Sequence, residues 1–252
     1  MSSGEDVVTG NKTSAATRAY QHLVRSVELR LVLPGERLPT AAALAQEIGV
    51  SRPAVLHALQ RMQEEGRIEI GAGRKGVTVL PAANSRAHRR GAALDKNWAE
   101  LSALVEITDP GIARVLARQG LTADVVAEAR ELIEQIKVTE DEDALLGLHN
   151  RFHLLLARAT GMKILEALGT MGRQLLSGVH DLADIPVAEP RVLAAEHEQL
   201  LTAILAGDAA RASDIAAWHV DATRDALRAV FGGTPFPERP RRTKKPARAG
   251  SA

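Results

Sequence analysis

The chain has 252 residues, of which 45% are hydrophobic and 25% charged, and its formal net charge is +1. These values are typical of globular proteins, and the length allows two ordinary domains. The absence of cysteine excludes disulfides and thiolate-bound metals. Its first residues do not show the charged-then-apolar pattern expected of a signal peptide, and the sequence contains no apolar run near the roughly 20 residues that span a bilayer. We expect a soluble, cytoplasmic protein without membrane contact.

The charge is unevenly distributed along the chain. Residues 13–80 carry nine basic and six acidic side chains, whereas residues 81–237 carry 16 basic and 22 acidic ones. Residues 238–252 carry six basic side chains against Glu238. A basic head, an acidic body and a basic tail favour a head that binds a polyanion, with ordinary surface variation as the alternative.

Three helices are predicted in the head. Apolar residues at helical spacing predict the first over about residues 14–31, and a Pro-Gly turn follows it. Thr40 is expected to cap a second helix that runs through Ile48. Ser51 is expected to cap a third that ends near Glu65. This order predicts a helix-turn-helix.

The residues after the third helix predict a β-hairpin wing. Residues 67–70 and 77–79 have β-type sequences and flank the Gly-rich, basic connector 71–76. We therefore predict a winged helix-turn-helix DNA-binding domain over residues 13–80, preceded by a flexible arm at 1–12.

The head resembles the GntR family of regulators. The matching residues are Leu33-Pro34-Gly35-Glu36-Arg37-Leu38-Pro39-Thr40, Leu44-Ala45, Gly49-Val50-Ser51-Arg52, Val55, Ala58-Leu59 and Glu65-Gly66, with the Gly-rich wing after them. The resemblance implies a homodimer on double-stranded DNA. Its third helix lies in the major groove and its wing tips point towards the minor groove.

The residue chemistry is consistent with that placement. Ser51 and the free N–H groups beside it are suited to a phosphate, and Arg52 to a phosphate or a guanine edge. Arg74 and Lys75 suit the backbone or a narrow minor groove. The alternative for Arg52 and for His57 is a solvated surface position. The candidate DNA-binding residues are Thr40, Ser51, Arg52, Pro53, His57, Arg74, Lys75 and Gly76.

The head departs from the family at two positions. The family has an Arg early in the second helix and another on the third, where this chain has Ala42 and Leu56. We therefore expect an operator that differs from the usual one.

After a linker at 81–95, helical patterns dominate the domain at 96–232, and a basic disordered tail follows at 233–252. The predicted helices span about 97–119, 122–138, 141–160, 162–184, 189–206 and 208–231. We expect a mainly α protein, in which the winged helix-turn-helix is followed by an all-α antiparallel helical bundle.

Four histidines lie on the apolar faces of three predicted helices. His149 and His153 are four residues apart and share one face, and His197 and His219 each lie on another helix. Each buried imidazole needs a polar partner, and a divalent metal serves all of them. Imidazole ligands favour zinc, nickel, copper or iron. From the spacing alone, core histidines and a metal site both remain open.

The body resembles the FCD-type ligand-binding domain of the FadR-like GntR branch. The matching stretches are Phe152-His153, Ala159-Thr160-Gly161, Glu196-His197, Ile204-Leu205-Ala206-Gly207-Asp208 and His219. The resemblance implies a divalent transition metal, with zinc expected and nickel or another ion as alternatives. Three of the histidines match the family's ligands, while His149 replaces its Asp. This replacement makes the site less anionic and the metal more attractive to a carboxylate.

A further departure concerns the small-molecule effector. Aligning Asp109-Pro110 with an acidic position of the family puts Val105 where the family often has an acid-binding Arg. The effector is then either not a typical small carboxylate or held by another group. Arg173 and His180 are the candidates, and the alternative for both is a helix-surface position.

The resemblance implies a ligand-responsive regulator and not an enzyme: a repressor that a metabolite releases from DNA. One alternative is a regulator that senses the ion itself. Another is a helical metallohydrolase, but the sequence has no His-Glu-x-x-His run and no Gly-x-Ser-x-Gly elbow. Such an enzyme would also leave the winged head unexplained.

Overall fold

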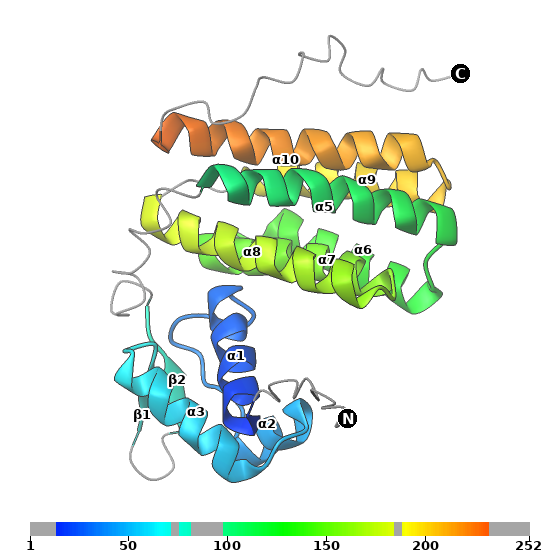
Figure 1. Cartoon of the computed structure of the whole chain (residues 1–252). Coiled ribbons are helices and arrows are strands. Elements are labelled where there is room, and N and C mark those ends of the chain that lie inside the picture. The colour runs from blue at the N-terminus through cyan, green and yellow to red at the C-terminus, as the bar shows by residue number, and fades with distance from the viewer. Residues whose placement is uncertain (1–13, 72–75, 82–97, 184–187, 232–252) are drawn as a thin grey trace, which may run out of the picture.

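The computed structural model describes residues 14–71, 76–81, 98–183 and 188–231. The head consists of α1 (Ala15–Glu28), α2 (Ala41–Ile48), α3 (Arg52–Glu64), β1 (Ile68–Ile70) and β2 (Val77–Val79). The body consists of α5 (Trp98–Gln119), α6 (Ala123–Val138), α7 (Glu142–Ala159), α8 (Lys163–Ala183), α9 (Pro190–Leu205) and α10 (Ala209–Phe231). The predicted winged helix-turn-helix followed by a helical bundle is confirmed (Figure 1).

Several predicted features lie outside the described residues. These are the arm at 1–12, residues 82–95 of the linker, the wing residues Arg74 and Lys75, and the tail at 233–252.

The head is built from the local signals that its sequence contains. The Thr40 and Ser51 hydroxyls accept hydrogen bonds from the backbone N–H groups of Ala43 and Ala54, so both predicted caps are present. Gly49 ends α2 with φ of 69°, a left-handed conformation that glycine adopts without strain. This turn separates α2 from α3, on which Arg52, Pro53 and His57 are exposed.

The first helix ends three residues earlier than predicted, at Glu28. Arg30 has a left-handed φ of 52°, and the side chain of Leu29 is fully buried. The backbone oxygen of Leu29 accepts a hydrogen bond from the Asn150 side chain of α7. A contact with the body therefore accompanies the end of α1, and local helical periodicity does not reveal such a contact.

The body encloses a core of aliphatic side chains. α5 packs against α8, α9 and α10, while α6 packs against α7 and α9. Fully buried side chains include Leu116, Ile136, Phe152, Leu201 and Ile204. Among the helices described, none is both long enough and apolar enough to cross a membrane.

The head contacts the body through the residues that follow α1 (Figure 1). Arg30 forms an ion pair with Asp143, and Arg151 donates a hydrogen bond to the backbone oxygen of Leu31 at 2.8 Å. Gly147 of α7 faces the same segment, and a Cβ atom there would lie 2.5 Å from the backbone oxygen of Arg30. Only glycine permits this close approach of the two domains.

Candidate metal and ligand site

The predicted DNA-contacting residues that the structure describes lie on the outer side of the head. Arg52, Pro53 and His57 are exposed on α3. Thr40 and Ser51 cap α2 and α3, and Gly76 precedes β2 with φ of 73°. This arrangement leaves the first turn of α3 accessible to a large ligand.

The third helix also carries a structural arginine. The Arg61 guanidinium lies 3.7 Å from the centre of the Tyr20 ring and forms an ion pair with Glu65. Leu56, where the resemblance leads one to expect an arginine, is 47% exposed and presents an apolar side chain on α3. Both arginines are exposed, but Arg61 is held by Tyr20 and Glu65 within the head, whereas Arg52 lies in the first turn of α3.

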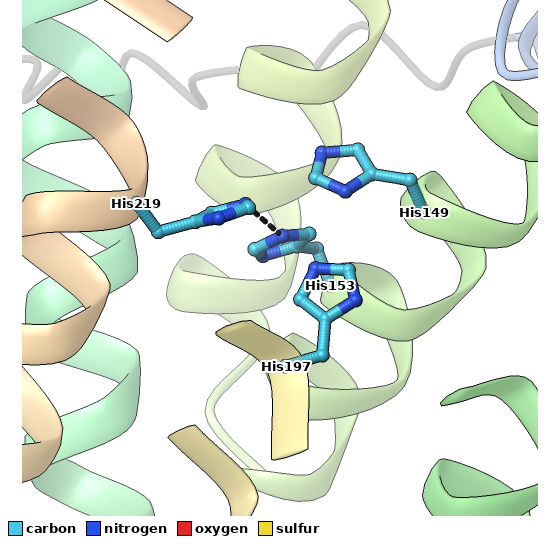
Figure 2. A group of neighbouring side chains, drawn as sticks. All are labelled: His149, His153, His197 and His219. Carbon is cyan, nitrogen blue, oxygen red and sulfur yellow. Dashed lines mark hydrogen bonds between the residues drawn. The ribbon is translucent and has the colours of Figure 1, made fainter. Parts of the chain in front are cut away.

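The structure brings the four predicted histidines together in the body. His149 and His153 come from α7, His197 from α9 and His219 from α10, and all four are buried. One ring nitrogen from each lies within 4.8 Å of the other three. Figure 2 shows the four rings turned towards one another. We call these four residues the histidine cluster.

Two buried carboxylates orient two of these rings. The Nδ1 atom of His219 lies 2.7 Å from Glu196, and that of His153 lies 3.3 Å from Asp109. Because an ionised carboxylate only accepts hydrogen bonds, Nδ1 of His219 carries the ring proton, whereas the longer contact between His153 and Asp109 does not fix the tautomer of His153. The Nε2 atom of His219 is then a lone-pair donor, as in many metal sites where a carboxylate orients the ligand.

The Nε2 atoms of two of these rings face each other. The Nε2 atoms of His153 and His219 are 3.3 Å apart (Figure 2). This is a hydrogen-bonding distance, and with Nε2 of His219 as the acceptor His153 is the donor, so a metal ion bound to both atoms would replace that proton. A tetrahedral zinc ion with Zn–N bonds of about 2.0–2.1 Å separates two ligands by about 3.3–3.4 Å. The spacing of the pair fits such an ion.

His197 supplies further evidence that the cluster is suited to a metal. Its side chain is fully buried, and neither ring nitrogen has a hydrogen-bond partner in the described part of the chain. The ring stacks on Phe152 with 4.2 Å between the centres, which fixes its plane. A buried polar atom without a partner is costly, and a metal ion removes this cost at one nitrogen.

His153 and His197 are neutral at physiological pH. Burial lowers the pKa of His153 and His197 well below the ordinary value, and the charge of Arg173 lowers both further. Neutral imidazole is the form that binds metals. Burial raises the pKa of Asp109, and the adjacent Arg173 guanidinium opposes that rise.

Of the two predicted ligand-binding residues, Arg173 lies at the edge of the histidine cluster. Its side chain is buried, forms an ion pair with Asp109, and places Nη1 3.0 Å from Nε2 of His149. Val105 is buried on α5. The His180 side chain lies outside the described part of α8. The structure therefore places a permanent positive charge beside the histidines.

Sequence reasoning missed the two carboxylates as site residues. Asp109 lies on the buried face of α5 with Val105 and Ile112, and Glu196 lies beside His197 on the buried face of α9. A charged residue on an apolar helical stripe needs a polar partner, which was the available signal. The partners themselves, His153 for Asp109 and His219 for Glu196, lie on other helices and could not be identified from the local sequence.

The neutral histidines predict a pH dependence of stability in the metal-free protein. Because the folded-state pKa of His153 and His197 lies below the unfolded value, the unfolded chain binds more protons as the pH falls. The free energy of unfolding is therefore expected to fall below about pH 6.5, by up to about 1.4 kcal/mol per pH unit for each histidine. Urea unfolding of chelator-treated protein between about pH 7.5 and about pH 5 measures this. A free energy that is constant or rises towards low pH contradicts it, and replacing His197 by leucine is expected to make the dependence shallower.

Two family descriptions match the chain, one in each domain. Residues 15–79 match the bacterial regulatory proteins of the gntR family, and residues 100–222 match the FCD domain. The HTH-type transcriptional regulator LutR of Bacillus subtilis is 26% identical, over 83% of this chain and 98% of that protein. The Uxu operon transcriptional regulator of Escherichia coli is also 26% identical, over 85% and 88%.

A solved structure agrees in fold. Escherichia coli McbR/YncC has a TM-score of 0.50 and 21% identity, over 87% of this chain and 99% of that chain. The similar curated proteins are named as transcriptional regulators and not as enzymes. The chain belongs to the GntR family of DNA-binding transcriptional regulators and has an FCD ligand-binding domain.

Proposed function

We propose that this regulator is a repressor that a small metabolite releases from DNA, and that the metabolite binds beside a divalent metal in the histidine cluster. The observation that supports the metal best is the group of four buried imidazoles, whose ligand nitrogens lie within 4.8 Å of one another. A donor set made of imidazoles favours zinc, with nickel, copper or iron as alternatives. When bound, such an ion supplies a Lewis-acid centre for an anionic group of the metabolite.

The residues around the cluster support an anionic metabolite. Arg173 is the buried cation at its edge, and guanidinium groups bind carboxylates through two parallel hydrogen bonds. Its ion pair with Asp109 holds the guanidinium in place. A carboxylate is therefore the ligand class we propose. Arg173 would bind the acid group, because Val105 stands where the resemblance implies an acid-binding arginine. His180 stays a second candidate.

Two helices of the site also hold the head, which supports a route for the signal. On α7, His149 belongs to the cluster, and the next residue, Asn150, donates hydrogen bonds to the Leu29 backbone oxygen at 3.2 Å and to Ser177 at 2.9 Å. Asn150 is buried, so its loss leaves polar atoms unpaired. A shift of α7 at His149 therefore moves the end of α1.

The second connection starts from α8. Arg173 lies in the site, and the next residue, Gln174, donates a hydrogen bond to Glu28 of α1 at 3.2 Å. Glu28 forms an ion pair with Arg67, which also pairs with Glu65 just after α3. This chain of polar contacts leads from the site to the DNA-binding helix. Coupling between two sites is typically about 1–3 kcal/mol, enough for a severalfold change in affinity.

We propose that the protein binds its operator as a homodimer, with one winged head on each half-site. Large apolar side chains on α5 and α8 are exposed, namely Ile107, Ile164 and Met171. Covering them with a second copy removes apolar surface from water. On each head, Arg52 reads a base or holds a phosphate, and Arg74, Lys75 and Gly76 of the wing meet the backbone.

Replacing Arg52 by alanine tests the DNA-binding role. A bidentate contact to guanine contributes about 1–3 kcal/mol, so we expect a loss of about 5–150-fold in affinity. Fluorescence anisotropy with a duplex from upstream of the protein's own gene measures it, together with a stoichiometry of two chains per duplex. Arg118→Ala removes the same charge from the body and is the control. Equal affinities of wild type and Arg52→Ala contradict the assignment, and one chain per duplex contradicts the dimer.

A second candidate is a regulator in which the ion itself is the signal. Four imidazoles fill a tetrahedral metal site and leave no position for a metabolite, which favours this candidate. Measuring operator affinity with zinc alone, and then with zinc and small carboxylates, distinguishes the two. A change with zinc alone supports the ion as the signal, whereas a change that requires the carboxylate supports the metabolite.

A further inference from the structure

The hydrogen bond between Arg173 and His149 conflicts with metal binding by His149. Arg173 places Nη1 3.0 Å from Nε2 of His149. A guanidinium stays protonated and has no acceptor, so Arg173 is the donor and Nε2 of His149 is the acceptor. A neutral imidazole has one lone-pair nitrogen and one N–H, so Nδ1 of His149 carries the proton.

In this state His149 has no lone pair left for a metal. If Nε2 were the ligand atom, the metal would need the lone pair that Arg173 occupies. If Nδ1 were the ligand atom, Nε2 would carry the proton and two donors would face each other at 3.0 Å. Both assignments therefore require Arg173 to leave His149.

We propose that Arg173 withholds His149 from the metal, so that the resting site has three imidazole ligands and an open fourth position. The ligands are then His153, His197 and His219. The inference rests on the proposed metal site and refines it. Metal sites that bind exchangeable ligands keep such an open position, whereas closed four-ligand sites are structural. With only three histidines bound, the metal keeps one coordination position for the metabolite.

The position of Arg173 supports this division of roles. Its other amino group forms an ion pair with Asp109, and Asp109 also contacts the Nδ1 atom of His153. The guanidinium is buried and held from two sides, so a metal ion must compete with a fixed hydrogen-bond donor for the lone pair of His149. His149 is then a conditional ligand that closes the site only when Arg173 is drawn away.

A double-mutant cycle on zinc affinity tests the inference. The four proteins are wild type, His149→Ala, Arg173→Met and the double variant, titrated with zinc against a chromophoric chelator. Removing the arginine charge strengthens zinc binding with or without His149, so this effect cancels in the cycle. We expect His149→Ala to have little effect in wild type and to weaken zinc binding at least about tenfold in the Arg173→Met background.

A second test uses only the wild-type protein and determines which ring nitrogen of His149 carries the proton. In ¹⁵N spectra of the histidine side chains, we expect His149 to keep its proton on Nδ1 in both the metal-free and the zinc-loaded protein. A metal-bound nitrogen of His149 in the zinc-loaded wild type overturns the inference, as does an equal cost of His149→Ala in both backgrounds. If wild type and Arg173→Met both fail to bind zinc, the metal site itself is refuted, and the inference with it.

Discussion

Replacing His197 by leucine is expected to abolish zinc binding while leaving the metal-free protein at least as stable as wild type. Both ring nitrogens of His197 are buried without a hydrogen-bond partner in the described residues. Exchanging such a polar group for an apolar one of similar size is neutral or stabilising. Zinc binding should fall by more than the roughly 10–100-fold that losing an outer-shell partner costs, because a ligand itself is lost.

Two measurements on this variant separate a ligand role from a structural one. Titration with zinc gives the affinity, and urea unfolding of chelator-treated protein gives the free energy of unfolding. Wild type should gain about 2.7 kcal/mol when free zinc is 100 times its dissociation constant, and the variant nothing. His22→Ala is the control, since His22 pairs with Glu47 on the head, far from the cluster in sequence. A variant that binds zinc like wild type contradicts the assignment of His197.

Replacing Phe152 by alanine is expected to have the largest effect on stability. The side chain is fully buried in the body core, and its ring stacks on His197. Removing a buried phenylalanine costs about 3–5 kcal/mol, through the lost apolar burial and the cavity left behind. Because His197 loses its stacking partner, zinc affinity should fall as well. Urea unfolding and zinc titration measure the two effects.

Phe152→Leu is the matched control for this prediction. Leucine retains most of the volume and removes the aromatic stacking, so it should cost less than about 1.5 kcal/mol. A loss below about 1 kcal/mol for Phe152→Ala would show that the core around His197 refills the cavity, contrary to the close packing described here.

The fold was largely predictable because its signals are local. The caps Thr40 and Ser51 and the left-handed Gly49 act within a few residues, and the structure has them where the sequence predicts them. The end of α1 was not predictable in the same way. The Asn150 hydrogen bond to Leu29 joins residues 121 positions apart, and no local pattern contains it.

The site shows the same division between local and distant information. The spacing of His149 and His153 on one helix predicted that they share a face, and His197 and His219 lie on the apolar faces of two other predicted helices. The family resemblance then pointed to a metal that these histidines share. The position of Arg173 could not be read in this way, because its partners Asp109 and His149 belong to two other helices. The structure therefore shows what a histidine at position 149 does that a sequence comparison does not. An aspartate there would form an ion pair with Arg173, whereas His149 accepts a hydrogen bond from Arg173 with its Nε2 lone pair.

The most direct test of the metal site is anomalous X-ray scattering at the zinc edge, from crystals of protein loaded with one equivalent of zinc. We predict one anomalous peak per chain within bonding distance, about 2.0–2.1 Å, of His153 Nε2, His219 Nε2 and a ring nitrogen of His197. A peak elsewhere on the chain, or none in the histidine cluster of zinc-loaded crystals, would contradict the proposal.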